Sequence, residues 1–348
     1  MKKILHHSRF EAKPFGHGGE RRTTQIVEHY KELGFEIENI NLKPTKHLKL
    51  QYIFKSFVLL KNVYGLTDWY SIKRFFKWWK KLYELYPSLE KAFKTDAEHF
   101  IWESTTDSFY FLPYFAKKMG KKVYAYPHNI ESLVKEQKSS ITGKFAPQGY
   151  LAEIEAYSIC DKILSISRFD HQLFQLFNLN SEFFPYYPPK EVELLLKSIK
   201  MQRESHSKKN VDLTHYLILG TVYNPPTRIG MEILMNWINN NATPNCSFSI
   251  AGYGTEIFRN GMKNSNVEVL GSLSSDEMEN AMIQCDALLV YQIATTGVLT
   301  RVVEFNVAGI PVILNADAAY SFLGMGGVFV YSDFDSIIGL KKAINNRI

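Results

Sequence analysis

Two charged side chains stand three residues apart in the segment Thr295 to Leu314, in a setting that suits phosphate chemistry. If the stretch between Thr-Thr-Gly and Gly309 is helical, Arg301 and Glu304 share one face of that helix. The first N–H groups of a helix have no internal partner, so a phosphate can bind there. Arg301 would then meet a diphosphate, and Glu304 could accept two hydrogen bonds from the vicinal hydroxyls of a ribose. The alternative for the same spacing is a solvated ion pair on an ordinary amphipathic helix.

Short apolar runs flank this helix and predict buried strands at Asp286 to Tyr291 and at Ile310 to Leu314. Gly309 ends the helix, and Pro311 prevents its continuation. A strand, a helix and a strand of this length indicate a right-handed crossover between parallel strands. The Thr-Thr-Gly loop therefore lies at the carboxyl edge of the sheet, where such sheets bind ligands.

Other predicted strands in the second half of the chain end in glycine. The residues at these ends are Gly220, Thr221, Gly252, Leu270 and Gly271, and Arg228 follows the first of them closely. Each is an ordinary turn if taken alone. Together they predict glycine-bearing loops along one edge of one sheet, where backbone can approach a ligand.

In the first half, Gly16-His17-Gly18-Gly19 follows the first predicted strand, and Arg21 and Arg22 come next. The glycines allow close approach of backbone and the arginines supply charge, although a plain turn is the alternative. His128 lies just past another predicted strand, where it either faces a ligand or is satisfied by local backbone. Glu103 ends a strand in the same layer and could equally bond a neighbouring loop.

Strand-like and helix-like segments alternate along the chain, which predicts an α/β protein with mainly parallel sheets. The first series of strands is KKILHH, FEIENINL, HFIWES, KKVYAY and KILSIS; the second is HYLILG, SFSIAG, VEVLG, DALLVY and IPVIL. Helices are expected near Glu20 to Leu33 and near Gly230 to Asn239. We therefore expect an N-terminal domain over residues 1–189, a linker region over 190–212 and a C-terminal domain over 213–348, whose last helix could return to the N-terminal domain.

Composition narrows the class of protein. The 348 residues suit two domains, and 45% hydrophobic with 14% aromatic residues favours packed globular structure. Residues 1–150 carry a formal charge of +11 and residues 151–348 one of −5, so the first half is the basic half. The three widely spaced cysteines predict neither a disulfide framework nor a zinc site, and no run is long enough to span a bilayer. A cytoplasmic protein is expected.

The order of these motifs resembles the retaining GT-B glycosyltransferases of the group-one, or family-four, class. The resemblance covers nearly the whole chain and is most specific from Gly220 to Leu314, through VEVLGSLSSDEMENAMIQCDALLVY and TTGVLTRVVEFNVAGIPVIL. It implies two Rossmann-like domains facing each other across a cleft. The C-terminal domain would hold a nucleotide-diphosphate sugar, and the N-terminal domain the acceptor.

The resemblance also implies roles for single residues. Glu304 would hold the donor ribose, Arg301 and Arg228 would bind the leaving diphosphate, and His128 would contact and orient the transferring sugar. Backbone contacts to the phosphates would come from Thr296, Gly297, Gly18 and Gly19, with Gly220, Thr221 and Gly252 also on the donor side, and contacts to the base from Leu270 and Gly271. The resemblance implies transfer without a metal ion, so no metal ion and no cofactor is expected; the nucleotide sugar is the substrate.

Two positions depart from the family pattern. The first of two glutamates found eight apart in many members is Thr296 here, and the usual loop arginine is Leu299. The expected function remains transfer of a sugar with retention to a glycan or lipid-linked acceptor in cell-surface polysaccharide synthesis. The alternatives are a GT-B sugar-nucleotide epimerase and a non-catalytic glycosyltransferase-like partner protein.

The segment Ile72 to Tyr86 bears on the acceptor. Its apolar residues form one helical stripe, while lysines and Trp78 occupy the rest. Such a helix can pack on its own domain and expose its lysine face to solvent. An exposed tryptophan among lysines also suits an anionic membrane surface. We expect peripheral contact at the inner face of the membrane and no binding of nucleic acid.

Overall fold

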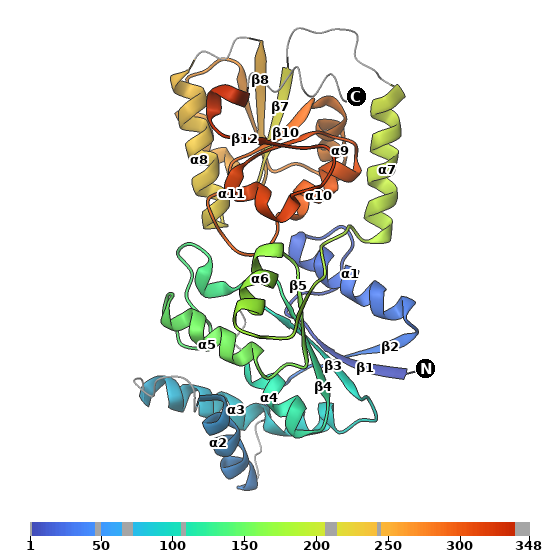
Figure 1. Ribbon diagram of the computed structural model, residues 1–348, viewed down its shortest axis with the longest axis vertical. Helices are drawn as coiled ribbons and strands as arrows, with labels where there is room; N and C mark the ends of the chain where they lie inside the picture. The colour runs from blue at the N-terminus through green and yellow to red at the C-terminus, as the bar shows by residue number, and fades with distance from the viewer. Residues whose placement is uncertain are drawn as a thin grey trace. The chain divides into compact units, whose positions relative to one another are not determined.

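A computed structural model describes residues 2–45, 50–64, 72–105, 109–205, 214–241 and 245–337. Two compact units make up the chain. The first runs to Tyr186 and includes Thr296–Val298, and the second comprises Tyr187–Thr295 and the chain from Leu299 onward. Each unit is built on one six-stranded parallel sheet (Figure 1).

The sheet of the first unit has the order β2-β1-β3-β4-β5-β6. Its strands are β1 (Lys2–His7), β2 (Phe35–Asn39), β3 (His99–Ser104), β4 (Lys122–Pro127), β5 (Lys162–Ser165) and β6 (Ser181–Phe183). The helices are α1 (Gly18–Glu32), α2 (Gln51–Tyr64), α3 (Ile72–Phe93), α4 (Phe111–Lys118), α5 (Gln148–Tyr157) and α6 (Arg168–Leu176), with a 3₁₀ turn η1 (Glu131–Leu133).

Both faces of the first sheet are buried, because successive side chains of a strand point to opposite faces. Leu5, Phe100 and Trp102 belong to a large core with α2, α3, α4 and α5. Their neighbours Ile4 and Ile101 belong to a smaller core that includes residues of α1. The helices therefore cover both faces of the sheet. The ends of the strands remain as the place for functional side chains.

The sheet of the second unit has the order β12-β11-β10-β7-β8-β9, the doubly wound arrangement of a Rossmann-like fold. Its strands are β7 (Thr214–Leu219), β8 (Cys246–Ala251), β9 (Val267–Gly271), β10 (Ala287–Val290), β11 (Val312–Asn315) and β12 (Val328–Tyr331). The other elements are α7 (Lys190–Ser205), α8 (Pro225–Asn240), α9 (Ser275–Gln284), α10 (Thr300–Val307) and α11 (Ala316–Ala319), with 3₁₀ turns η2 (Thr255–Gly261) and η3 (Tyr320–Phe322).

Helix α8 covers one face of this sheet, and α7, α9 and α10 pack together on the other (Figure 1). Leu234 and Ile238 of α8 are buried against Ile218 and Phe248 of the sheet. Helix α9 begins at a capping box, in which the Ser274 hydroxyl and the Glu277 carboxylate satisfy backbone N–H groups of the first turn. Gly309 follows α10 with a φ of +68°, a conformation that glycine adopts without strain.

The predicted α/β class with two parallel sheets is confirmed, and each predicted strand is present. The short strands β6 and β12 were not predicted. The stretch expected as a linker contains the 16-residue helix α7, which packs on α9 and α10. The predicted last helix lies outside the described residues. None of the helices in the described ranges combines the length and apolarity that crossing a membrane requires.

Candidate functional site

The second sheet has a topological switch point between β7 and β10. Strands β8 and β9 continue from β7 in one direction, and β11 and β12 continue from β10 in the other. Connections from two such strands leave in opposite directions and open a crevice at their carboxyl ends, where doubly wound folds bind ligands. The loop after β7 and the loop before α10 therefore flank the natural ligand position of this unit.

Arg301 lies on the first turn of α10, beside the end of β7. A Cβ atom placed on Gly220 would lie 4.0 Å from the guanidinium carbon of Arg301. The Nε atom of Arg301 is buried and makes no hydrogen bond to any residue the structure describes. Burial lowers the pKa of Arg301 to about 10, against the opposing effect of Glu304. A cation held in this way lacks partners that an anionic ligand would supply.

Glu304 follows Arg301 by three residues on the same helix, as predicted, and is buried with 7% of its surface exposed. Its negative charge favours the charged form of Arg301. Arg301 and Glu304 are therefore not a solvated ion pair at the protein surface, because Glu304 is buried. The structure brings Arg301 next to Gly220 at the switch point, and Glu304 follows three residues later on the same helix.

The glycines at the ends of β7, β8 and β9 form a contiguous strip of backbone. The Gly220 N–H donates to Ala251 O at 3.0 Å, and the Gly252 N–H donates to Gly271 O at 2.8 Å. A Cβ atom on Gly252 would lie 1.8 Å from Gly220 O, so this crossing requires glycine. The three predicted glycines are thus neighbours, packed against one another at the carboxyl edge.

Three further candidates lie around this strip. The Thr221 hydroxyl accepts the Tyr223 N–H at 3.3 Å within the loop after β7. Arg228 lies in α8, where its Nε is 3.7 Å from a carboxylate oxygen of Glu232. Leu270 is half-buried near the end of β9.

Thr296 and Gly297 pack with the first unit. The Thr296 hydroxyl accepts the Ile130 N–H and donates to Ile130 O, both at 3.1 Å. The Gly297 N–H donates to the Asp170 carboxylate at 3.1 Å. Gly297 has a φ of +81°, and a Cβ there would lie 2.8 Å from His128 O. The structure thus brings Gly297 next to the backbone of His128.

The glycine pair of the first unit opens α1. His17 caps this helix, and its Nδ1 accepts the Gly19 N–H at 3.1 Å. The space beside Gly19 is filled by the Phe10 ring, which also packs against the rings of His17 and His128. Gly18 is the first residue of the helix.

Arg22 has a structural role, in contrast to the expectation that it supplies charge to a ligand. Its side chain is 1% exposed and donates to the carbonyl oxygens of Phe184 and Pro185 at 2.8 and 3.1 Å. The guanidinium also lies 4.8 Å from the centre of the Phe184 ring. Burial lowers its pKa to about 10. Its place beside the glycine loop in the sequence gave no sign of these partners.

His128 follows β4 and is held by a side chain rather than by local backbone alone. Its Nε2 lies 2.8 Å from the Oε2 of Glu103, which is completely buried at the end of β3. His6 and Thr23 also hydrogen-bond the same carboxylate, at 2.6 and 2.7 Å. Glu103 was not assigned to the site from its sequence, where the only signal was its position at the end of a predicted strand in the same layer as His128.

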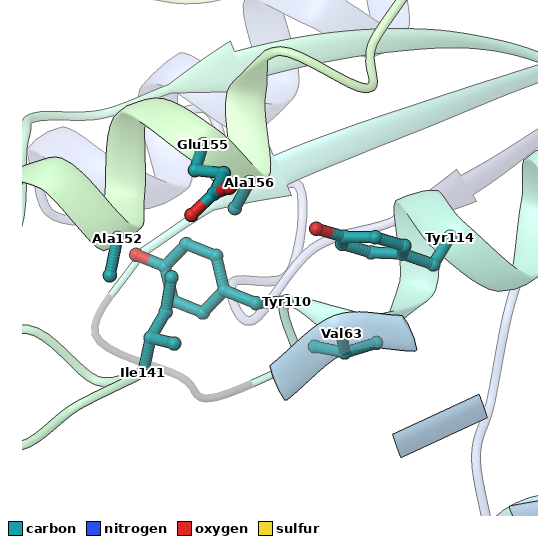
Figure 2. A pocket seen from close by; sticks show the side chains of 7 residues that line it. All are labelled: Val63, Tyr110, Tyr114, Ile141, Ala152, Glu155 and Ala156. Carbon is teal, nitrogen blue, oxygen red and sulfur yellow. The ribbon is translucent and has the colours of Figure 1, made fainter. Parts of the chain in front are cut away.

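The first unit also contains a small cavity of about 10 Å³ lined by residues of α2, α4 and α5, among them Tyr114 and Glu155, and by Tyr110 just before α4 (Figure 2). That volume accommodates roughly one water molecule. It is too small for a nucleotide or a sugar. Within the described ranges, no group of three or more His, Cys, Asp or Glu side chains is arranged to hold a metal ion.

Solved glycosyltransferase structures of the GT-B type share this fold over the full chain. Sucrose-phosphate synthase from Thermosynechococcus elongatus is 12% identical with a TM-score of 0.61, over 99% of this chain and 90% of that one. Anabaena HepE in complex with UDP is 13% identical with a TM-score of 0.60, over 99% and 89%. α,α-Trehalose 6-phosphate synthase from Burkholderia multivorans is 8% identical with a TM-score of 0.58, over 100% and 88%. No protein-family model and no curated protein matches the sequence. The similarity establishes the fold.

Proposed function

We propose that this protein is a glycosyltransferase that uses a nucleotide-diphosphate sugar as donor. The observation that best supports the proposal is the switch point of the second unit, where Arg301 lies beside Gly220 and interacts with the charge of Glu304. Nucleotides bind at this position in doubly wound folds. The solved structures that share the fold include HepE with UDP-glucose, which supports the same class of donor.

In the proposed mechanism, Arg301 and Arg228 stabilise the leaving diphosphate, and Glu304 accepts hydrogen bonds from the ribose hydroxyls. His128 of the first unit orients the transferring sugar. Transfer proceeds with retention and without a metal ion. A donor phosphate oxygen accepts the proton of the incoming hydroxyl, so the reaction needs no protein base. The acceptor is a glycan or a lipid-linked sugar of a cell-surface polysaccharide.

The binding assignment is tested by thermal shift with UDP, GDP, dTDP and their sugars, followed by calorimetry with the preferred nucleotide. Glu304→Ala removes charged hydrogen bonds worth about 1.5–3 kcal/mol, so affinity should fall roughly tenfold to a hundredfold. Asp276→Ala removes an exposed carboxylate from α9 and serves as the matched control. Unchanged nucleotide affinity in Glu304→Ala would refute the assignment of Glu304.

A second variant tests whether Arg301 contacts the diphosphate of the donor. Arg301→Met should weaken binding of the nucleoside diphosphate much more than binding of the free nucleoside, because only the former carries the anionic group. Equal loss for both ligands would exclude Arg301 as the phosphate contact. Epimerisation of the donor in the absence of an acceptor would support the epimerase alternative, and absence of any nucleotide binding would support the non-catalytic partner.

We propose peripheral membrane contact through α2 and α3 as a second property of the first unit. The tryptophans are not its exposed anchors: the Trp79 indole donates to Ser56 Oγ at 3.1 Å, and Trp78 packs against Phe111. Phe54 and Phe76 are exposed instead, at 72% and 54%. Exposed lysines of the two helices complete the surface, namely Lys61, Lys77 and Lys80.

Co-sedimentation with vesicles containing anionic phosphatidylglycerol tests this surface. Each phenylalanine that enters the interface contributes about 1.5–3 kcal/mol, so replacing both Phe54 and Phe76 by serine should weaken binding by about 10²- to 10⁴-fold. Phe145→Ser is the matched control, because Phe145 is 50% exposed in a loop outside these helices. A wild-type protein that stays in the supernatant refutes the proposal.

A further inference from the structure

A row of polar side chains crosses four adjacent strands of the first sheet at their carboxyl ends. Asn39 ends β2, His6 lies near the end of β1, Glu103 lies near the end of β3, and His128 follows β4. These strands are neighbours in the sheet, in the order β2-β1-β3-β4. The row therefore follows from the topology and from strand register, in which His6 pairs with Asn39.

Hydrogen bonds connect the whole row. His6 Nδ1 lies 2.9 Å from Asn39 Oδ1, and His6 Nε2 lies 2.6 Å from Glu103 Oε1. Both ring nitrogens of His6 thus face oxygen acceptors, and this arrangement favours the doubly protonated imidazolium. Burial lowers the pKa of His6, but the hydrogen bond and charge of Glu103 outweigh burial and raise it. His6 neutralises the buried carboxylate.

The other carboxylate oxygen serves His128. Glu103 Oε2 accepts the Thr23 hydroxyl at 2.7 Å and the His128 Nε2–H at 2.8 Å. Burial alone would raise the pKa of Glu103, but the hydrogen bonds from His128 and His6 hold it well below its usual range. An ionised carboxylate only accepts hydrogen bonds, so Nε2 of His128 carries a proton, and in the Nε2–H tautomer the lone pair is on Nδ1.

The opposite ring nitrogen of His128, Nδ1, is the one that the Glu103 carboxylate does not use. Nδ1 of His128 makes no hydrogen bond to any residue the structure describes, and the side chain is 13% exposed. The Phe10 ring packs on one side of the imidazole, with 5.4 Å between ring centres. Phe10 is itself tied to the row, because its N–H donates to Ser8 Oγ and Ser8 hydrogen-bonds Thr23.

We propose that Glu103 is a positioning residue that fixes His128 in the Nε2–H tautomer, so that Nδ1 presents a lone pair to a hydroxyl group of the sugar. The inference rests on the proposed function for the identity of that hydroxyl, but the tautomer is a property of the protein alone. A lone pair accepts from a hydroxyl and repels the oxygens of a phosphate, so this nitrogen selects the sugar over the diphosphate.

Two replacements separate an acceptor role from a merely structural one. In Glu103→Gln the amide oxygen can still accept from His128 and Thr23, while the amide nitrogen donates to a neutral His6. In Glu103→Leu no acceptor remains for His128. Glu38→Gln, at an exposed carboxylate on β2, is the control.

The first measurement is ¹⁵N NMR of the histidine rings in the full chain at pH 8, assigned with a His128→Gln spectrum. The wild type and Glu103→Gln should show His128 as the Nε2–H tautomer, and Glu103→Leu should show a mixture or the Nδ1–H tautomer. A wild-type His128 protonated on Nδ1, or an unchanged single tautomer in Glu103→Leu, overturns the proposal. Because the wild-type and Glu103→Gln spectra can by themselves support or overturn the assigned tautomer, the test survives if the leucine variant does not fold.

The second measurement is release of UDP from UDP-glucose or of the nucleotide from whichever donor binds. Misplacing a group that orients the substrate costs about 10²-fold in rate, so kcat of Glu103→Leu should fall by about that factor with KM little changed. Glu103→Gln should stay within a few-fold of the wild type. Unchanged kcat in Glu103→Leu overturns the positioning role while leaving the glycosyltransferase proposal intact. If the NMR result is as expected but no nucleotide binds, the positioning of His128 is supported and the glycosyltransferase proposal is refuted. His128 is then positioned in a protein of another function.

Discussion

Glu153→Gln should stabilise the first unit above neutral pH. Glu153 lies on α5 with 0% of its surface exposed. Its Oε2 accepts the Ser132 N–H at 3.3 Å and the Ser132 hydroxyl at 3.2 Å. Its Oε1 is buried without a hydrogen-bond partner among the described residues. A glutamine can accept the same two bonds through its amide oxygen and carries no charge.

The magnitude follows from the pKa of Glu153, which burial raises from 4.5 to about 7 against the hydrogen bonds from Ser132. A folded-state pKa above the unfolded one means that the native protein binds the proton more tightly. The resulting stabilisation is fully present below pH 4.5 and is lost as the pH rises through 7. Between pH 5 and pH 8 the wild type should therefore lose about 2–3 kcal/mol that Glu153→Gln keeps.

Differential scanning calorimetry at several pH values from 5 to 8 measures this difference. For a unit of this size, about 2–3 kcal/mol corresponds to roughly 4–12 °C in Tm. The Tm of Glu153→Gln minus that of the wild type should grow by this amount across the range. Glu36→Gln, at an exposed position on β2, should show no such growth. A pH-independent difference between Glu153→Gln and the wild type would refute the reasoning.

Three further changes test the packing that holds the candidate sites. Gly252→Ala would place a methyl group 1.8 Å from Gly220 O at a φ of +124°, so the second unit should lose about 3 kcal/mol or more, measured as Tm. Arg203→Met removes a cation that donates to three carbonyl oxygens at the end of α9, at 2.6–2.8 Å, and should cost about 2–4 kcal/mol in thermal denaturation. Trp79→Phe removes the indole donor to Ser56 and should cost about 1 kcal/mol in the stability of the first unit.

Matched controls accompany these changes. Gly261→Ala should be nearly neutral, because a Cβ atom there meets nothing within 4 Å. Lys197→Met removes an exposed cation from the same helix as Arg203 and should change Tm little. Trp78→Phe keeps an aromatic ring against Phe111 and should cost less than Trp79→Phe. Equal losses in a variant and its control would contradict the role given to the variant position.

The candidate site was predicted best where it depends on neighbouring residues in the chain. The helix that carries Arg301 and Glu304 was predicted from their spacing, from Gly309 and from the flanking apolar runs. It begins at Thr300, several residues after the predicted Thr-Thr-Gly start. The glycines at the ends of β7, β8 and β9 were predicted to share an edge, because parallel strands bring their carboxyl ends to one side.

Side-chain roles that depend on distant partners could not be predicted. Arg22 stands beside a glycine loop in the sequence, yet its hydrogen bonds go to Phe184 and Pro185. Trp78 falls among the lysines of its helix, yet its ring packs against Phe111 of α4. In both cases the sequence indicated a polar setting, and another element of the fold supplied the contact.

The sequence by itself determined the order of strands and helices, because alternation, helical periodicity and glycine stops act over a few neighbouring residues. Only the tertiary structure decided which strand ends become neighbours. Sheet order places Asn39, His6, Glu103 and His128 in one hydrogen-bonded row, although these residues lie far apart in the sequence. Burial then gives that row its chemistry, since a carboxylate removed from water stays ionised only where enough donors surround it.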